Sequence, residues 1–428
     1  MIFFRATNSI NIKITDGTIL KYNRFKAPIG IENETIYLTT YDDFNDLKDI
    51  FAKVDKSKYN AKIINEQSVL KNPSFPTQLG VIIENESIER LELKDLRFLE
   101  LKEQNFLNQL KSFHKSSIKV AIIGSLGSSI SQMISGMAAL RIFYNKLKEI
   151  YKVVKLDVYI KASNNSYYNR DKSIYLTQDY INDILPLAIN SKAICEYDYF
   201  VDNSIDITKI LDINPVDAWL FKFGIDYKKI SDLEKFSQLK TDHFELTKGL
   251  KQKIQESKQR GKLLLFHPYS ANINKSIPQN FAIEILKNLI EKLDDYTIVS
   301  TLLIDSKIKA DNFLDLSLYS KTIEDFIYIV ASCDKLITAY TSALHIADCF
   351  MIPTVCIATF KEYEEQLKYY KYTKTIFVKD SSKNLSKFIY ENDSLTINKF
   401  EEWKKLKIED IVKVLESFWY NNGSKLNK

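Results

Sequence analysis

The sequence predicts an α/β protein with two doubly wound, Rossmann-like domains, an added N-terminal α+β domain and a C-terminal helix. A strand–helix alternation starts at Ile118 and begins a second time near residue 250. Short, largely apolar strands such as IKVAII and KLLLF are typical of parallel sheets that are buried on both faces. Their alternation with helices implies right-handed βαβ units. At 428 residues and 45% hydrophobic, the chain can bury two or three cores.

These patterns divide the chain into four expected parts. They are an N-terminal α+β accessory domain at 1–115, a first Rossmann-like domain at 116–240, a second at 241–385, and a C-terminal helical segment at 386–428.

The N-terminal part contains hairpin, strand and helix signals but no catalytic constellation. NIKITDGTILKY alternates apolar and polar residues around Asp16-Gly17, which predicts a hairpin. ETIYLTT and LGVIIEN are strand candidates, and TTYDDFNDLKDIFAKV is an amphipathic helix with a capping residue at its start. A charged stretch, 91–117, leads out of this part. We expect a packing or oligomerisation module.

The first Rossmann-like part reads as a series of strands and helices. IKVAIIGS, VVKLDVYIKA and YDYFVDNS are strands, and a long helix follows the first of them. Ser173 to Ala193 is expected to be a loop and then a helix that Pro186 bends or interrupts.

The second Rossmann-like part repeats the alternation. HFELTKGLKQKIQESKQRG is a helix closed by Gly261, and Thr322 is a candidate N-cap for TIEDFIYIVASCDK. KLLLFHPYS, YTIVSTLLI, DKLITAY and PTVCIAT are strands, with a helix expected from Thr341. NKFEEWKKLKIEDIVKVLESFWYNN is an amphipathic helical tail.

The charge balance and the cysteine spacing indicate which partners and which compartment the protein is expected to have. The net charge of +5 from 60 Lys+Arg and 55 Asp+Glu is near balance, so nothing favours nucleic acid as a partner. A local basic face toward anionic lipid or sugar phosphate remains open. The four Cys form no CxxC pair, which indicates buried free thiols and a reducing compartment. Since the sequence has neither a signal-peptide layout nor an 18-residue apolar stretch, we expect a cytoplasmic protein.

The stretch LITAYTSALHIADCFMIPTVCIATF is a candidate anion site. Its strand ends at Tyr340, and Thr341 and Ser342 open a helix whose free N–H groups and dipole favour negative charge. His345 lies one turn later on the same face and could donate to a phosphate or ribose oxygen. The alternative is a core histidine bonded to a backbone carbonyl, and spacing does not separate the two.

Two further stretches could contribute to a site. In HPYSANINKSIPQNF a strand ends at His267, and Lys275 stands just before Pro278 at a helix start, where it could neutralise a phosphate. A solvated surface lysine is the more common case. In GSLGSSISQMISG, Gly124 and Gly127 allow a tight turn, but the spacing is not GxGxxG.

Together the three stretches resemble the heptosyltransferase-like glycosyltransferases, glycosyltransferase family 9, which have the GT-B fold. IIGSLGSSISQMISGMAALR resembles the Gly-x-x-Gly-Asp turn and helix of that family. The second-domain motif of the family has Lys-x-Trp-Pro seven residues after a Pro, and here Pro268 is followed at that spacing by Lys275 and then by Ser-Ile-Pro. YTSALHIADCFMIPTVCIATF matches its final motif in register, at Thr341, His345, Ala347, Pro353 and Val355. The resemblance covers about 118–385.

The resemblance implies transfer of a sugar, heptose-like or hexose, from a nucleotide diphosphate donor, with inversion and without a metal or other cofactor. Lipopolysaccharide, a surface glycan, a lipid-linked glycan or a protein would be the acceptor. It implies a donor site formed by Tyr340, Thr341, Ser342 and His345, with Lys275 neutralising the leaving group, and an acceptor near Gly127 and Ser128.

Four departures from the family pattern bear on activity. Ser128 stands where the family has the acidic residue taken as the general base, and a Ser hydroxyl cannot accept a proton near neutral pH without help. Tyr340, Ser342 and Tyr269 replace an Asp and two Gly. The base must then come from elsewhere, and Asp171 and His267 are candidates.

Two other hypotheses share this fold. One is a catalytically degenerate GT-B scaffold that binds a nucleotide sugar or a partner without turnover, which the missing acid favours. The other is a nucleotide-sugar epimerase. The extra residues 1–115 leave room for a homo-oligomer, and peripheral membrane contact stays open.

Overall fold

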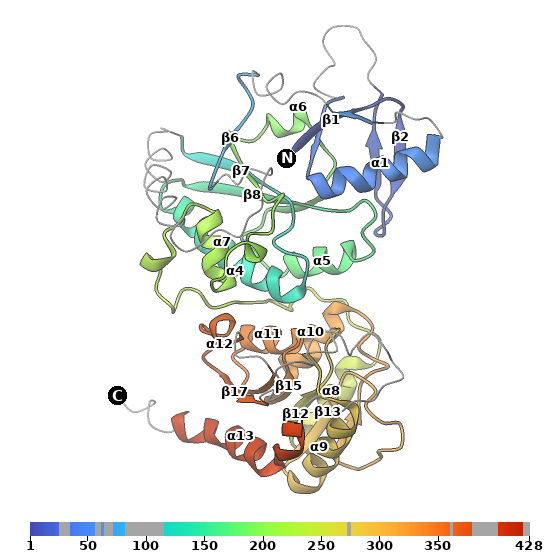
Figure 1. Cartoon of the computed structure of the whole chain (residues 1–428), viewed down its shortest axis with the longest axis vertical. Helices are drawn as coiled ribbons and strands as arrows, with labels where there is room; N and C mark the ends of the chain where they lie inside the picture. The colour runs from blue at the N-terminus through green and yellow to red at the C-terminus, as the bar shows by residue number, and fades with distance from the viewer. Residues whose placement is uncertain are drawn as a thin grey trace. The chain divides into compact units, whose positions relative to one another are not determined.

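The structure is a computed structural model that describes residues 1–24, 35–55, 61–63, 72–81, 115–271, 275–359, 363–378 and 401–422. The chain divides into two compact units, Met1–Lys235 and Phe236–Lys428 (Figure 1). The predicted four-part division is finer than this and stays a prediction.

The first unit is built on a parallel sheet of five strands. Its order is β6 (Thr77–Gln78), β11 (Tyr199–Asp202), β7 (Ser117–Ile123), β8 (Val153–Ile160) and β9 (Asp183–Pro186). The chain builds outward from β7 through β8 to β9 and then returns to place β11 on the other side of β7. The strand order therefore reverses between β7 and β11, and ligands of open α/β sheets bind at such a switch point.

Helices cover one face of this sheet, as Figure 1 shows. They are α4 (Ile130–Lys148), α5 (Tyr168–Tyr175) and α7 (Pro215–Lys222). Helix α4 begins after the Gly-rich turn at Ser129, and Ser129 and Gln132 form a capping box that satisfies the free N–H groups at the helix start.

A second, antiparallel sheet packs on the other face. It runs β10 (Ile189–Asn190), β4 (Tyr37–Thr39), β1 (Ile2–Ala6) and β5 (Ala61–Ile63), accompanied by the hairpin of β2 (Ile10–Lys13) and β3 (Ile19–Tyr22), and by α1 (Tyr41–Asp55) and α6 (Ser191–Ile194). Phe3 and Leu38 share one core with Ile123 and Tyr159 of the parallel sheet. Strand β10 comes after β9 in the chain and pairs with β4, so residues beyond 115 complete the antiparallel sheet that the N-terminal residues begin.

The second unit contains a six-stranded parallel sheet. Its order is β14 (Phe313–Asp315), β13 (Tyr296–Ser300), β12 (Lys262–His267), β15 (Lys335–Ala339), β16 (Thr354–Ala358) and β17 (Thr373–Phe377). In order of appearance this is 3-2-1-4-5-6, the Rossmann order, with its switch point between β12 and β15.

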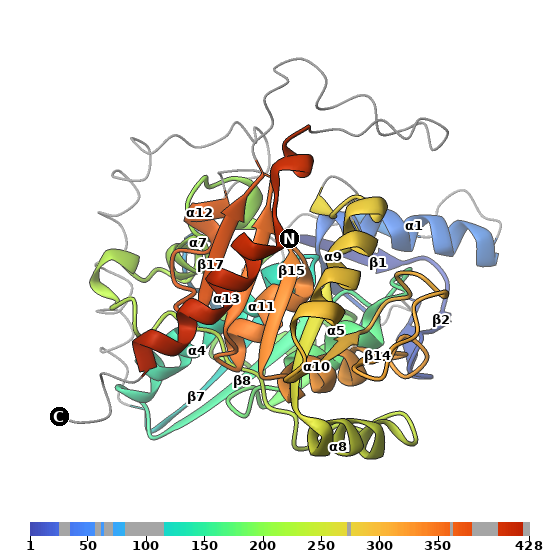
Figure 2. The ribbon, with the colours of Figure 1, turned by 90° about the horizontal axis from the view of Figure 1, so that it is seen from below.

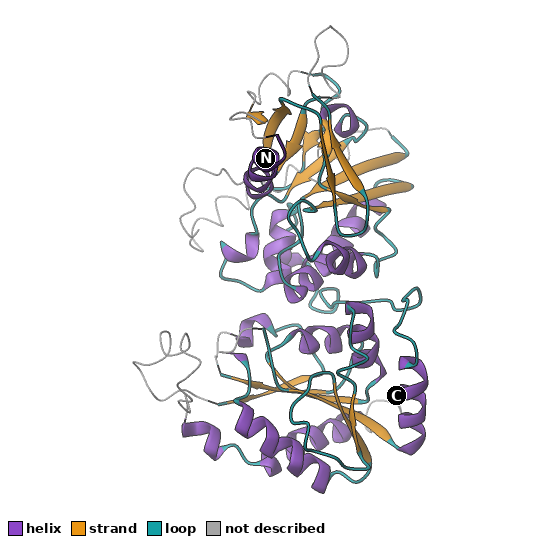
Figure 3. Ribbon diagram, turned by 90° about the vertical axis from the view of Figure 1, so that its right-hand side faces the viewer, coloured by secondary structure: helices purple, strands orange, loops and turns teal. Residues whose placement is uncertain are grey.

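Helices lie on both faces of this sheet (Figures 2 and 3). They are α8 (Leu250–Arg260), α9 (Gln279–Lys292), α10 (Ile323–Ser332), α11 (Ser342–Cys349), α12 (Tyr363–Gln366), the 3₁₀ turn Glu401–Lys405 and α13 (Ile408–Asn422). Ile411 and Leu415 of α13 are buried in the core under β12 together with α9. The predicted C-terminal helix and doubly wound fold are confirmed.

Several local predictions are confirmed. Gly17 has φ +87° in the β2–β3 hairpin. Thr40 caps α1 by accepting the Asp43 N–H, and Thr322 caps α10 in a capping box. The four Cys are free thiols, and three of them are buried. Among the described residues, no helix is long and apolar enough to cross a membrane.

Two local predictions are wrong. Residues 183–190 form β9 and β10, where a loop and helix were expected. Pro186 ends the edge strand β9, a position that needs no proline N–H. The helix predicted from His243 begins only at Leu250, because Gly249 has φ +86° and interrupts the helical backbone. The strand candidate LGVIIEN and the charged stretch 91–117 lie largely outside the described residues.

A buried carboxyl, Asp43, joins α1 to the loop after β8. Its side chain accepts hydrogen bonds from Thr39 and Ser163, and Lys161 and Asp46 lie close enough to act on its charge. Burial is the largest effect and raises the pKa of Asp43 to about 6. The two hydroxyls and Lys161 oppose this rise.

We expect Asp43 to reduce stability as the pH rises. Its pKa is higher in the folded chain, so the unfolded chain releases the proton first. The free energy of unfolding then falls between about pH 4 and about pH 6, by at most about 1.4 kcal/mol for each pH unit. In urea titrations Asp43→Asn should lose this slope, and Asp42→Asn at the exposed neighbouring position should keep it. Equal slopes in all three proteins would contradict the assignment.

Candidate functional site

The switch point of the second unit brings together the two stretches that were expected to hold a diphosphate. Lys275 follows β12, and Tyr340 to Ser342 follow β15, its neighbour in the sheet. The carboxyl ends of two parallel neighbours lie at the same edge, so both stretches face the crevice in which α/β sheets bind ligands.

A chain of hydrogen bonds fixes this edge. The Thr338 hydroxyl donates to the carbonyl of His267, at 2.8 Å. Its oxygen lies 2.8 Å from the Thr341 hydroxyl, which must therefore be the donor in that pair. The Thr341 oxygen in turn accepts the Ala343 N–H, at 3.2 Å. The buried Thr341 side chain thus shapes the turn and caps α11.

The start of α11 has hydrogen-bond donors without a partner in the described part of the chain, and they are the backbone N–H and the hydroxyl of Ser342. Its side chain is half-buried, and neither its N–H nor its hydroxyl makes a hydrogen bond to the described part of the chain. The helix dipole adds partial positive charge at this point, worth about 0.3–1 kcal/mol for an anion. Ser342 is therefore the residue of this turn that is best able to meet a phosphate oxygen.

Lys275 lies beside the same turn. Its ammonium is 4.9 Å from the centroid of the Tyr340 ring, a cation–π contact. Burial lowers the pKa of Lys275, which indicates a lysine that is partly withdrawn from water. Tyr340 itself is buried and its hydroxyl donates to Gln366, so its ring forms one wall of this edge.

His345 is buried behind that wall. Its Nδ1 lies 2.6 Å from the Tyr370 hydroxyl, and its ring makes edge contacts with Tyr340 and Tyr370. Burial, with a smaller effect of the nearby Lys275 charge, lowers its pKa to about 3. His345 is thus a neutral, buried imidazole whose partner is a hydroxyl and not a backbone carbonyl.

His267 is also buried. Its Nδ1 lies 2.9 Å from Thr301 Oγ1, and its ring packs against Phe326. Burial lowers its pKa to about 4, so its imidazole is a weak base near neutral pH. His267 belongs to the second unit, whereas the other catalytic candidates, Ser128 and Asp171, belong to the first.

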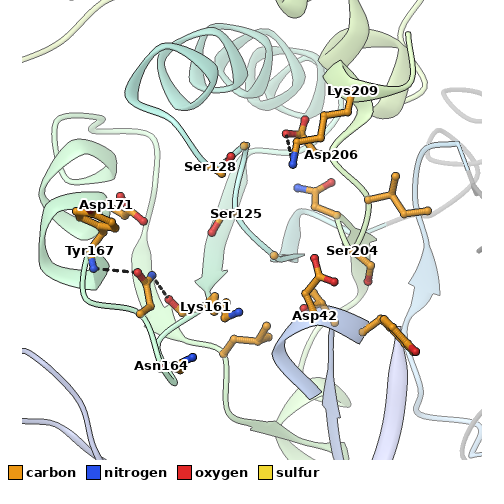
Figure 4. Close-up of a pocket in the computed structure, with 18 of the residues that line it drawn as sticks. Asp42, Ser125, Ser128, Lys161, Asn164, Tyr167, Asp171, Ser204, Asp206 and Lys209 are labelled. Atoms are coloured by element: carbon orange, nitrogen blue, oxygen red, sulfur yellow. Dashed lines mark hydrogen bonds and ion pairs between the residues drawn. The ribbon is translucent and has the colours of Figure 1, made fainter. Parts of the chain in front are cut away.

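The first unit has a cavity of about 1120 Å³ at the carboxyl edge of its parallel sheet (Figure 4). It is lined by the segments that follow β7, β8 and β11 and by the first turn of α1. The predicted residues Gly127, Ser128 and Asp171 all line it. The charged side chains in its lining are Asp42, Lys161, Arg170, Asp171, Asp206 and Lys209.

The Gly-rich turn forms one side of the cavity. Gly127 has φ +95°, and a Cβ there would lie 2.4 Å from the Cβ of Gln132, so only glycine fits. Ser128 is exposed, and its N–H and hydroxyl both lie within hydrogen-bond distance of Gln132 Oε1. No carboxylate is bonded to Ser128 in the described part of the chain.

Asp171 is the buried carboxylate of this cavity. Arg170 donates two hydrogen bonds to its Oδ1, at 2.8 and 2.6 Å. Burial raises the pKa of Asp171, and the Arg170 charge opposes that rise. In the view of Figure 4, Asp171 and Asp206 lie on either side of Ser128.

Sequence reasoning missed Asp206. Thr208 donates two hydrogen bonds to its Oδ1, and Gln132 donates one to its Oδ2, so both oxygens are engaged. The sequence did offer one indication of Asp206. It lies four residues after the strand YDYFVD, where residues that follow the carboxyl end of a parallel strand often bind ligands. No group of three or more His, Cys, Asp or Glu arranged to hold a metal occurs among the described residues.

Two Rossmann-like parallel sheets, one in each unit, are the architecture of the GT-B fold. No protein-family model and no curated protein matches the sequence. Among solved structures, the fold is similar to E. coli ADP-heptose LPS heptosyltransferase II. The TM-score is 0.50 at 12% identity, over 72% of this chain and 100% of that one.

Two further solved structures are more distant. A glycosyl transferase family 9 protein from Veillonella parvula has a TM-score of 0.47 at 10% identity, over 71% of this chain and 98% of its own. E. coli heptosyltransferase WaaC with ADP has a TM-score of 0.46 at 11% identity, over 70% and 99%. The similarity to heptosyltransferase II confirms the predicted resemblance to the heptosyltransferase-like glycosyltransferases at the level of the fold.

We expect His267 and His345 to stay neutral through the physiological range, because burial holds their pKa at about 4 and about 3. Their imidazole NMR signals, assigned with His267→Gln and His345→Gln variants, should not shift between about pH 5 and about pH 8. A titration midpoint above about pH 5 for either ring would contradict the buried geometry.

Proposed function

We propose that the protein is a glycosyltransferase that moves a sugar from a nucleotide diphosphate donor, held by the second unit, to an acceptor hydroxyl held by the first. The observation that carries this proposal is the placement of Lys275 beside the start of α11, at the Rossmann switch point. A diphosphate needs hydrogen-bond donors and a counter-charge, and this edge offers both in the Ser342 donors and the Lys275 ammonium.

The proposed reaction depends on stabilising the negative charge that develops on the diphosphate leaving group. As the acceptor oxygen attacks the anomeric carbon, the bond to the diphosphate breaks and its electrons pass to the leaving oxygen. Lys275 and the Ser342 N–H stabilise that negative charge where it develops. Attack on the face opposite the leaving group gives inversion, and the chain's own cation would stand in for a metal.

Asp171 is the candidate that best fits the role of general base. It lines the same cavity as Ser128, where Arg170 donates two hydrogen bonds to its Oδ1 and Asn165 contributes a further side-chain hydrogen bond. Asp206 has both oxygens engaged by Thr208 and Gln132. Because burial raises the pKa of Asp171, this carboxylate is a stronger base than an exposed one.

The acceptor classes inferred from sequence are lipopolysaccharide, a surface or lipid-linked glycan, and protein. They stay predictions, as do the cytoplasmic location, peripheral membrane contact and a homo-oligomer through residues 1–115.

The proposal is tested by the fate of the donor. Purified protein is incubated with ADP-sugars and UDP-sugars, with and without glycan acceptors. A transferase releases ADP or UDP slowly to water and faster with an acceptor. Tight binding with no release would favour the degenerate scaffold, and a new nucleotide sugar formed without acceptor would favour an epimerase.

We expect Lys275→Ala to raise the Kd for ADP or UDP about 10-fold, or about 1.4 kcal/mol, because it removes a half-buried counter-charge. Calorimetric titration measures this, and Lys287→Ala, at an exposed position on α9, is the matched control. Unchanged affinity in Lys275→Ala would place the diphosphate elsewhere.

Asp171→Asn should lower the rate of donor cleavage about 100-fold or more and leave donor Kd unchanged, as expected for loss of a general base. The wild-type rate should fall at acid pH as the Asp171 carboxyl takes up a proton. The rate of Asp171→Asn should not show this fall. Asp206→Asn serves as the comparison. The assignment fails if Asp206→Asn is the variant that loses activity and Asp171→Asn retains it.

A further inference from the structure

Asn203 is a buried amide without a partner in the cavity of the first unit. It follows β11 directly, is 5% exposed and lines the cavity. Neither its side-chain oxygen nor its side-chain nitrogen makes a hydrogen bond to the described part of the chain. An unsatisfied buried polar group costs about 1–3 kcal/mol, so both atoms need a hydrogen-bond partner from outside the chain, a water or a ligand that fills the cavity.

The backbone holds this amide in place. The Asn203 N–H donates to the Ile123 carbonyl at 2.8 Å, which ties it to the end of β7. A Cβ on Gly124 would lie 3.0 Å from the Asn203 carbonyl oxygen, so the Gly-rich turn packs closely against it. A fixed amide offers two donors and one acceptor, a pattern that suits neighbouring hydroxyls of a sugar.

Two exposed aromatic rings also line the cavity. Tyr41, at the start of α1, is 53% exposed, and Tyr167, before α5, is 59% exposed. The Arg170 guanidinium lies 4.3 Å from the Tyr167 ring centroid and supports that ring. Exposed rings inside a polar cavity are suited to the apolar C–H faces of sugar rings, with hydroxyls meeting the polar groups around them.

The positively charged side chains that line the cavity each lie next to a carboxylate of the first unit. Lys161 pairs with Asp46, Arg170 pairs with Asp171 at 2.6 Å, and Lys209 lies 3.9 Å from Asp206. The exposed carboxylate of Asp42 is then in excess. Among the described lining residues, the positive charges of Lys161, Arg170 and Lys209 are thus matched by carboxylates, and the cavity has no excess of positive charge that would select an anionic ligand.

We propose that this cavity binds an uncharged oligosaccharide, which Asn203 recognises through its hydroxyls and Tyr41 and Tyr167 through its ring faces. The inference rests on the proposed function in one respect, that this ligand is the acceptor. It also gives residues 1–115 a role in acceptor selection, since Thr40 and the first two residues of α1, Tyr41 and Asp42, belong to the wall.

The test is binding of the full chain, without nucleotide, to an array of immobilised neutral, uronic-acid-containing, sialylated and phosphorylated glycans. We expect signal on neutral glycans. Asn203→Leu should reduce it about 10-fold or more, and Asn288→Leu, at a site on α9 in the other unit, should not. Because leucine removes two unsatisfied polar atoms at similar volume, the melting temperature of Asn203→Leu should hold or rise.

Three outcomes would overturn the inference. They are binding to acidic glycans alone, no binding to any glycan, and wild-type binding by Asn203→Leu. Tyr167→Ala, a substitution at an exposed ring, provides a second variant that should weaken binding while the fold is kept. Failure of the proposed function is seen separately, as absent nucleotide binding or release while neutral glycans still bind.

Discussion

The hydroxyl of Thr338 is the contact on which the donor site depends. It joins the carboxyl ends of β12 and β15 by donating to the His267 carbonyl and accepting from Thr341. Thr341 is thereby fixed as the cap of α11, and Ser342 is left with the free donors at the helix start. The parallel strand order then brings Lys275 to the same edge. A shift in this register would separate the counter-charge from the helix N-terminus and remove the reason for a diphosphate to bind.

Gln132 connects two sides of the cavity in the first unit. Its side-chain oxygen accepts from Ser128 at the Gly-rich turn, and its amide nitrogen donates to Asp206. Asp171 remains as a buried carboxylate on the other side of the cavity, and Asn203 as a buried amide without a partner. The N-terminal residues bring α1 into the same wall. In the proposed function, donor chemistry and acceptor recognition depend on separate sheets, each at the point where its strand order reverses.

Much of the fold follows from the sequence, because buried parallel strands are mostly apolar and caps such as Thr322 carry local signals. The helix after Ser173 was mispredicted, because residues 183–190 become strands only through pairing with β8 and β4, contacts that are distant in sequence. For the site, strand order and spacing suffice to bring Lys275 to Thr341. The partners of His345 and the roles of Asp206 and Asn203 depend on side chains from other elements, Tyr370 among them, which no local pattern indicates.

The central claim is that a diphosphate binds where β15 meets α11. A crystal structure of the protein soaked with ADP or UDP tests it most directly. The account predicts phosphate oxygens within hydrogen-bond distance of the Ser342 N–H and close to the Lys275 ammonium. A nucleotide bound at another place, or a Tyr340 ring that fills this edge and leaves no room for an anion, would contradict it.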